Sequence, residues 1–391
     1  MAPKLYFVIT DDWELRGNGS GDPRQIQFAP LRTFLRILGE HGIPGSINAE
    51  VMQQLTFRKY QTQYPELETL ADEWDGILCE AVRAGHDVQL HVHSQWREAV
   101  YADGKWRLKG NWSILDHPPE EAYAMISRCK AYLESLLGPV RPGYRCVAYR
   151  SGAWCIAPSD HMLPILSELG FVFDTSIVGG MRFNTRNLYL DYTACEESFV
   201  PFYPDMRDAR RVAPTPQPII SVPTSHFHQS GWSLLKRDFK ERIVPKRQFA
   251  TNAQMGNFSE EWKDLDAPGM LGLIKKAASR YVRGVTRASD ISACDYPTLR
   301  AMLSSIREQA CRAGLPEVPV VLVNHTKDVR DFSHIEKFVR DLALAPDVHC
   351  ITLTEVADRL LRGSFPIRTR QGYGTLAGAQ VVAPANTATA S

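Results

Sequence analysis

Residues that can carry charge or bind metal follow several short apolar segments of this sequence, where predicted strands end. In barrels of parallel strands, the active site lies at the carboxyl ends of the strands. Like charges at the rim of a sheet are costly unless a cation or a reaction uses them. We therefore expect these side chains to converge on one site. They are Asp11 and Asp12, His91 and His93, Arg150, Asp174 and His325.

Two imidazoles and one carboxylate from this set form a suitable site for a divalent ion. Side chains alternate along a strand, so His91 and His93 point to the same side. Imidazole and carboxylate ligands suit Zn²⁺, and a catalytic ion needs about three protein ligands and an open position. Either Asp11 or Asp12 would complete the set, and the other could act as a base toward water activated by the ion.

The remaining members fit supporting roles in the same chemistry. Arg150 would hold the aspartate that acts as the base and keep it ionised. A further histidine could protonate the leaving group. Each signal alone has an ordinary explanation, because Asp-Asp is common in turns and a lone His-x-His seldom binds metal. Their joint placement at successive strand ends favours a functional site.

The elements that position these residues alternate between strands and helices, which predicts an α/β fold. We predict a distorted (β/α) barrel with seven strands and a long insertion before the last strands. The expected strands include Lys4–Thr10, Ile43–Asn48, Asp87–His93, Cys146–Arg150, Phe171–Asp174, Ile219–Val222, Val318–Asn324 and Val348–Leu353. The expected helices include Phe28–His41, Leu67–Ala84, Pro118–Leu137, Ser159–Leu169, Tyr296–Ala313, Ser333–Leu344 and Thr354–Leu361.

Weak periodicity and frequent turn residues mark residues 178–290 as an insertion in a single barrel domain of residues 1–362. Within it, Trp232–Arg287 contains twelve Lys and Arg against six Asp and Glu, a local charge of about +6. Its later part, Leu271–Arg287, is expected to form a basic amphipathic helix. This segment could contact an anionic membrane or bind a phosphate-bearing substrate. From residue 363 to 391 the composition predicts a disordered tail.

Composition excludes some classes of protein and favours a cytoplasmic one. A formal net charge of +1 argues against a nucleic-acid binder defined by its charge. The eight cysteines form no Cys-x-x-Cys pair, so we expect reduced thiols. The first residues lack the pattern of a signal peptide, and no apolar run is long enough to span a bilayer.

The motifs resemble those of the metal-dependent polysaccharide deacetylases, carbohydrate esterase family four. The resemblance runs from Phe7 to about Leu361, interrupted by the insertion. Thr10-Asp11-Asp12 is similar to the Thr-Phe-Asp-Asp motif of the family, in which the first aspartate is the base and the second a metal ligand. Gly85-His86-Asp87-Val88-Gln89-Leu90-His91 is similar to its Gly-His-Glu-Ile-Gly-x-His stretch, whose last histidine is a ligand.

Three later motifs extend the resemblance. Tyr149-Arg150 is similar to the Phe-Arg motif, whose arginine holds the catalytic aspartate. The stretch 170–176 resembles the strand of the fourth motif, and Val323-Asn324-His325 resembles the fifth, whose histidine is a general acid oriented by an aspartate. The resemblance thus implies Asp11 as base, Arg150 as its clamp, His325 as acid with Asp174 as its partner, and Asp12 and His91 as ligands.

The sequence departs from the family pattern at three places. The position of the second ligand histidine is Gln95 here, so we expect His93 to replace it, with His226 or His228 as alternatives. The family's Arg-x-Pro is Arg150-Ser151-Gly152, which alters one wall of the site. Trp13-Glu14 follows the aspartates, and Glu14 could reach the metal or the substrate or lie at the surface.

The resemblance implies hydrolysis of an N-acyl, chiefly N-acetyl, group from an amino sugar. The expected cofactor is one divalent ion, Zn²⁺ first, with Co²⁺, Ni²⁺ or Mn²⁺ as alternatives. We expect Trp96, Trp154 and His226 to bind the sugar, and a cytoplasmic enzyme would take a small, nucleotide- or lipid-linked one. Two alternatives are a related amidohydrolase acting on a formyl or cyclic amide, and an inactive glycan-binding homologue.

Overall fold

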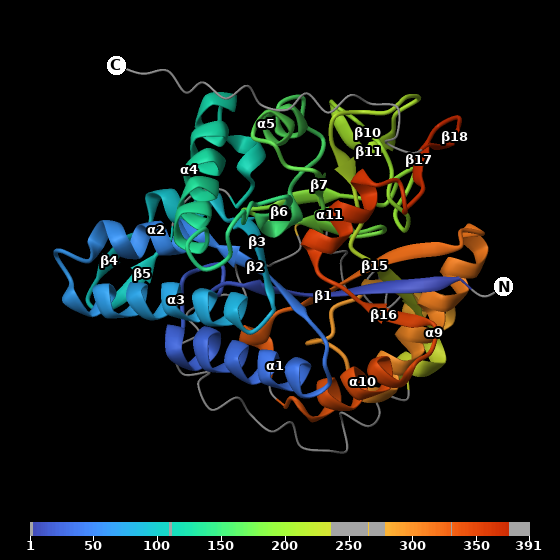
Figure 1. Ribbon diagram of the computed structural model, residues 1–391, viewed down its shortest axis with the longest axis horizontal. Coiled ribbons are helices and arrows are strands. Elements are labelled where there is room, and N and C mark those ends of the chain that lie inside the picture. The colour runs from blue at the N-terminus through green and yellow to red at the C-terminus, as the bar shows by residue number, and fades with distance from the viewer. Residues whose placement is uncertain (1–2, 109–111, 236–264, 266–277, 330, 375–391) are drawn as a thin grey trace.

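A curved sheet of parallel strands forms the centre of the molecule (Figure 1). The computed structural model describes residues 3–108, 112–235, 265, 278–329 and 331–374. Seven strands follow the order β12-β7-β6-β3-β2-β1-β15, and β16 pairs with β1 near its start. Their bounds are β1 Lys4–Trp13, β2 Gly45–Glu50, β3 Asp87–Val92, β6 Ala148–Ser151, β7 Phe173–Asp174, β12 Ile220–Ser221, β15 Glu317–Asn324 and β16 Val348–Cys350.

The two outer strands of this sheet, β12 and β15, approach each other through isolated bridges. Thr224, just after β12, makes a parallel bridge to Val321 of β15, and Asp290 makes another to Val323. The Ser225 N–H donates to the Val321 carbonyl at 2.8 Å. The sheet therefore curls into the distorted (β/α) barrel predicted from the sequence, joined along one side by single bridges instead of a continuous ladder.

Helices pack on the outside of the barrel and return the chain between parallel strands (Figure 1). Local signals fix their ends: Pro65 opens α3, Asp295 caps α9 by accepting from Thr298 N, and Thr352 and Glu355 form a capping box on α11. The helices are α1 Ala29–Glu40, α2 Val51–Tyr60, α3 Pro65–Arg83, α4 Pro119–Leu137, α5 Met162–Glu168, α9 Tyr296–Ala313, α10 Ser333–Leu344 and α11 Leu353–Leu361.

Helix α2 is absent from the prediction because its buried face is partly polar. Gln53 and Gln54 are both buried, so the apolar spacing of a helix is missing there. Glu50, the last residue of β2, caps the helix by accepting from Gln53 N at 3.2 Å. Short helical turns complete the connections: η1 Arg24–Phe28, η2 Ser94–Glu98, η3 Ile114–Asp116, η4 Gly152–Trp154 and η6 Thr326–Asp328.

Small hairpins decorate the barrel, mostly within the predicted insertion. They are β4 Val100–Ala102 with β5 Lys105–Arg107, β8 Arg182–Asn184 with β9 Tyr189–Asp191, β10 Pro204–Asp205 with β11 Asp208–Val212, β13 His226–Gln229 with β14 Val285–Ala288, and β17 Ile367–Thr369 with β18 Gly372–Gly374. The range 178–290 is not a separate unit, because it supplies β12 to the main sheet. Most of the basic segment Trp232–Arg287 lies outside the described residues. Of the predicted helix Leu271–Arg287, residues 278–283 are helical, as expected, but its last three residues belong to strand β14.

The predicted disorder from residue 363 is wrong for residues 363–374. Phe365 and Ile367 are fully buried, and the hairpin β17–β18 attaches to the barrel through the Tyr203 N–H, which donates to the Arg368 carbonyl at 2.9 Å. Residues 375–391 lie outside the described part of the chain. None of the eight cysteines, all of which lie in the described part of the chain, forms a disulfide. Among the described residues, no helix has the length and apolar composition required to cross a bilayer.

Candidate active site

A cavity of about 330 Å³ opens at the carboxyl ends of β1, β3 and β15. Aromatic and apolar side chains form much of its wall, and charged side chains form its floor. Five of the predicted site residues line it: Asp12, His91, His93, Trp154 and His325. Further lining residues include Glu14, Arg16, Trp112, Met181, Phe183, Leu188, Asp290 and Lys327.

Glu14, His91 and His93 lie together on the floor of this cavity. One ligand atom from each lies within 4.8 Å of the other two, and all three side chains are buried. Glu14 Oε2 contacts His93 Nε2 and lies 3.6 Å from His91 Nε2. Its other oxygen, Oε1, pairs with the Lys327 ammonium. Burial opposes the charged carboxylate, but His93 and Lys327 outweigh it and hold the pKa of Glu14 well below its usual value.

The two imidazole rings are oriented as metal ligands are. His91 Nδ1 lies 2.9 Å from the Arg150 carbonyl, so Nδ1–H donates there and leaves the Nε2 lone pair facing Glu14. Nε2 is buried and finds no hydrogen-bond partner in the part of the chain that the structure describes. His93 Nδ1 lies 3.0–3.3 Å from the Gln95 amide, which can accept from it in the same way. Two fixed Nε2 atoms beside a carboxylate fit a divalent ion such as Zn²⁺.

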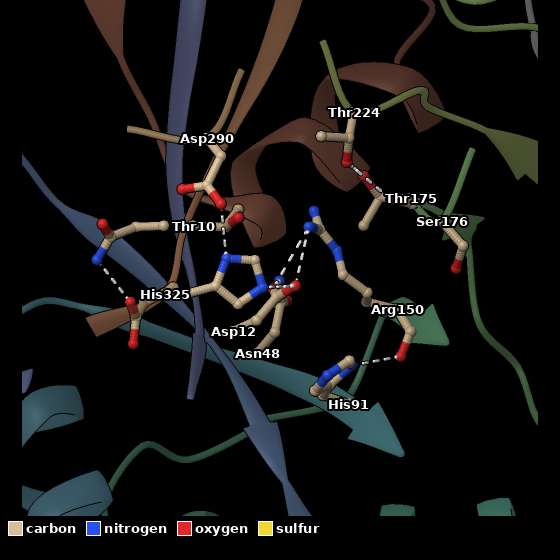
Figure 2. Close-up of polar contacts among 12 residues, drawn as sticks. Thr10, Asp12, Asn48, His91, Arg150, Thr175, Ser176, Thr224, Asp290 and His325 are labelled. Carbon is tan, nitrogen blue, oxygen red and sulfur yellow. Dashed lines mark hydrogen bonds and ion pairs between the residues drawn. The ribbon is translucent and has the colours of Figure 1, made fainter. Parts of the chain in front are cut away.

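Asp12 lies beside this cluster and is held by a buried arginine (Figure 2). Arg150 Nη1 lies 3.3 and 3.4 Å from the two oxygens of Asp12, and Asn48 Nδ2 donates to Oδ1 at 2.8 Å. Burial raises the pKa of this carboxyl, but Arg150, followed by His91 and His325, reverses the effect and brings the pKa below its ordinary value. Asp12 is therefore an ionised carboxylate next to the candidate metal cluster.

His325 faces Asp12 from the end of β15 and is held from behind by Asp290 (Figure 2). Its Nδ1 lies 3.0 Å from Asp290 Oδ2, and its Nε2 lies 3.7 Å from Asp12 Oδ2. Burial opposes protonation of the ring, but Asp290 outweighs it and raises the pKa of His325 to about 9. The ring is therefore a protonated imidazole with Nε2–H available toward the cavity.

Asp11 does not reach the cavity, which differs from the expected base at this position. Side chains alternate along β1, so Asp11 points to the opposite side from Asp12. It is fully buried, and both of its oxygens accept hydrogen bonds: Oδ1 from Asn324 Nδ2 at 2.6 Å and Thr326 N at 2.9 Å, and Oδ2 from Thr326 Oγ1 at 3.0 Å. Despite these donors, burial raises the pKa of Asp11 to about 7.

Asp174 is not the partner of His325, which is a second difference from expectation. Its carboxylate accepts from Ser176 N at 3.1 Å and from Ser176 Oγ at 2.6 Å at the end of β7, and Asp290 takes the predicted place. Burial raises the pKa of Asp174 to about 6, although Ser176 and the nearby Arg150 charge act against it. Asp174 therefore belongs to the buried shell around Arg150.

Two of the three predicted sugar-binding residues also lie outside the cavity lining. Trp96 is 2% exposed and packs edge-on against Phe57 and Trp106, so it stabilises its loop. His226 opens strand β13 and pairs with Ala288. Trp154 does line the cavity, and its ring lies over the Arg150 guanidinium at 4.6 Å.

The turn after β6 brings the chain unusually close to His93. A Cβ at Gly152 would lie 2.5 Å from the Val92 carbonyl oxygen and 2.8 Å from His93 Cγ. Ala153 and Trp154 follow with φ of 51° and 64°, the strained left-handed region that often marks functional sites. The departure from Arg-x-Pro at Gly152 is therefore required by the packing of His93.

Sequence reasoning left Glu14 open and missed Asp290. The signal for Glu14 was present, because residues two apart on a strand share a face and Asp12 and Glu14 have this spacing. Asp290 gave no such signal, since it lies in the predicted insertion and reaches His325 only through the bridge to Val323.

Comparisons with known proteins gave structural neighbours only. No protein-family model and no curated protein matches the sequence. A structure described as a polysaccharide deacetylase from Mycobacterium smegmatis is 15% identical, with TM-score 0.49 and coverage of 94% of both chains. PuuE allantoinase is 10% identical, with TM-score 0.45 and coverage of 92% of this chain and 90% of its own. A structure described as a polysaccharide deacetylase from Pseudomonas aeruginosa PAO1 is 9% identical, with TM-score 0.44 and coverage of 92% and 91%. At these values the site itself has to carry the functional assignment.

Proposed function

We propose that this chain is a metal-dependent hydrolase of the polysaccharide deacetylase type, which removes an N-acyl, chiefly N-acetyl, group from an amino sugar. One observation carries the proposal. A single cavity holds the Glu14–His91–His93 cluster next to an ionised carboxylate clamped by arginine and a protonated histidine clamped by aspartate. Binding alone would not require a base, its clamp and an acid beside a metal cluster.

Glu14, His91 and His93 would hold the ion through Oε2 and the two Nε2 atoms. A divalent ion in such a site polarises a carbonyl and lowers the pKa of water. The chain supplies the orientation: the Arg150 carbonyl and the Gln95 amide fix the two rings, and Lys327 holds the second oxygen of Glu14. This assignment replaces Asp12, the ligand predicted from the sequence, by Glu14.

Asp12 and His325 would then move the protons of an amide hydrolysis. Asp12 accepts a proton from the attacking water, and Arg150 keeps its carboxylate ionised and directed into the site. His325 Nε2–H donates to the nitrogen that leaves, while Asp290 keeps the other ring nitrogen in place. The new bond joins water oxygen to the acyl carbon, the C–N bond breaks, and the products are a carboxylate and an amine.

The cavity favours a small sugar as the substrate. Its volume of about 330 Å³ suits a single sugar unit with its acyl group, and Trp112, Trp154 and Phe183 offer aromatic faces for the ring. A nucleotide or lipid attached to this sugar, contact of the basic segment with a membrane, and a cytoplasmic location stay predictions from the sequence.

Metal content separates this assignment from the one expected from the sequence. We would equilibrate wild type, Glu14→Gln and Asp12→Asn with a limited excess of Zn²⁺ and measure bound metal after gel filtration. We expect about one ion per chain in wild type and in Asp12→Asn, and little in Glu14→Gln. If only Asp12→Asn loses the metal, Asp12 is the ligand, as expected from the sequence. If wild type takes up no metal, the proposed metal-dependent hydrolase is refuted.

Activity is then measured as acetate or formate released from a panel of N-acyl amino sugars. Wild type loaded with Zn²⁺ should release acid from at least one of them, and Asp12→Asn with the same metal content should not. Equal release by the two proteins would exclude Asp12 as the base.

A further inference from the structure

Arg16 is a buried cation on the wall of the active-site cavity that the proposed chemistry does not use. It lies two residues after Glu14, in the loop that leaves β1, and is 7% exposed. Its Nη1 is buried and has no hydrogen-bond partner among the described residues. Within the described part of the chain, no carboxylate forms an ion pair with this guanidinium.

The other cations of the cavity have anionic partners. Lys327 pairs with Glu14, His325 pairs with Asp290, and Arg150 behind the cavity pairs with Asp12. Burying an unpaired charge is unfavourable in a protein, so a buried guanidinium normally has an acceptor. Arg16 is therefore a positive charge that no described carboxylate neutralises, beside a space that a ligand can enter.

The loop holds Arg16 at the cavity. Gly21, at φ 105°, packs so closely that a Cβ there would lie 3.0 Å from Arg16 Nη1 and 2.3 Å from Ile26 Cδ1. Gly17 packs in a similar way on Trp112, another residue of the cavity wall, with 3.1 Å from a Cβ to Cη2. The guanidinium is thus packed against Gly21, and little entropy is lost when it binds a ligand.

We propose that Arg16 binds an anionic group of the substrate, so that the sugar hydrolysed here is an acidic one. The inference rests on the proposed function and narrows its substrate class to N-acyl amino sugars with a carboxylate or a phosphate. The planar guanidinium binds either group through two parallel hydrogen bonds. The anion supplies the missing counterion, and the ring stays between the aromatic wall and the metal cluster.

The test compares sugars that differ only in charge. Calorimetry on the Zn²⁺-loaded protein would give dissociation constants for N-acetylglucosamine, its 6-phosphate, its 1-phosphate and the corresponding 6-uronate. We expect wild type to bind one acidic sugar about 10- to 100-fold more tightly than the neutral one, the range of a charged hydrogen-bonded pair. Preference for the uronate would identify a carboxylate site, and preference for a phosphate ester would identify a phosphate site.

Three variants show whether Arg16 causes the preference. Arg16→Gln should bind acidic and neutral sugars equally, and Arg16→Lys should recover part of the difference. Arg24→Gln is the matched control, because it removes one positive charge from the helical turn η1 after the same loop, at an exposed pair with Glu73 outside the cavity. It should keep the full preference.

The outcomes separate this inference from the proposed function. A wild type without preference for any acidic sugar, or a preference that survives in Arg16→Gln, overturns the anion site, even if neutral N-acyl sugars are hydrolysed. Preference that depends on Arg16, without release of acid from any sugar, supports the anion site and refutes the deacetylase.

Discussion

The two sides of β1 near its carboxyl end show what distinguishes a structural carboxylate from a chemical one. On one side, Asp11 is fully buried, accepts hydrogen bonds from Asn324 and Thr326, and does not line the cavity. On the other side, Asp12 and Glu14 face a cavity and are balanced mainly by charged side chains. Adjacent identical residues thus differ in role because a strand turns alternate side chains to opposite faces.

The sharpest test of this comparison is the pair Asp12→Asn and Asp11→Asn. Asp12→Asn removes the proposed base but keeps its volume and the Asn48 contact, so kcat should fall by about 10² to 10⁴-fold with bound metal unchanged. Steady-state kinetics with the best substrate of the panel checks this. A fall below tenfold would mean that another group takes the proton.

The Asp290–His325 pair allows the proposed general acid, His325, to be tested in the same way as the proposed base. His325 must be protonated to donate, so activity should persist as pH rises and disappear through about 9. Its folded pKa lies above the ordinary 6.5, so its contribution to stability is complete below 6.5 and is lost as pH rises through 9. In Asp290→Asn the alkaline limb of kcat should move down by about 1 to 3 pH units. If the alkaline limb of kcat does not move in Asp290→Asn, the ionisation that limits activity at high pH is not that of His325.

The contact of Gln95 with His93 can be tested through metal affinity. Gln95→Leu removes the acceptor for His93 Nδ1–H and should weaken Zn²⁺ affinity by about 10- to 100-fold, measured by competition with a chelator. Gln95→Glu keeps an acceptor and should retain most of the affinity. Equal affinity in all three proteins would show that packing against Gly152 alone orients the ring.

Particular residues explain how far the sequence could predict this molecule. Apolar strands such as β1 and β15 have strong periodic signals, so the barrel and the gathering of His91, His93, Arg150 and His325 followed from pattern. The side of β1 on which each carboxylate lies did not follow from pattern. The motif resemblance assigned the roles of Asp11 and Asp12 from their order in the sequence and not from their orientation. Asp290 could not be predicted, since no local sequence pattern links it to His325 across the side of the barrel that is closed by single bridges.

The smallest expected effect belongs to Asp11. In Asp11→Asn, the side-chain carbonyl can still accept from Asn324 and Thr326 N, and the new amide can donate to Thr326 Oγ1, which rotates to accept. We therefore expect a loss of only about 1 kcal/mol in the free energy of unfolding by urea, with kcat and bound metal close to wild type. A large loss of kcat in a stable Asp11→Asn protein would instead make Asp11 the base, as the motif resemblance implied. Both asparagine variants replace one carboxylate oxygen at the same strand end. Any difference between them in kcat or stability is therefore due to the side of β1 on which the residue lies, and not to the residue type.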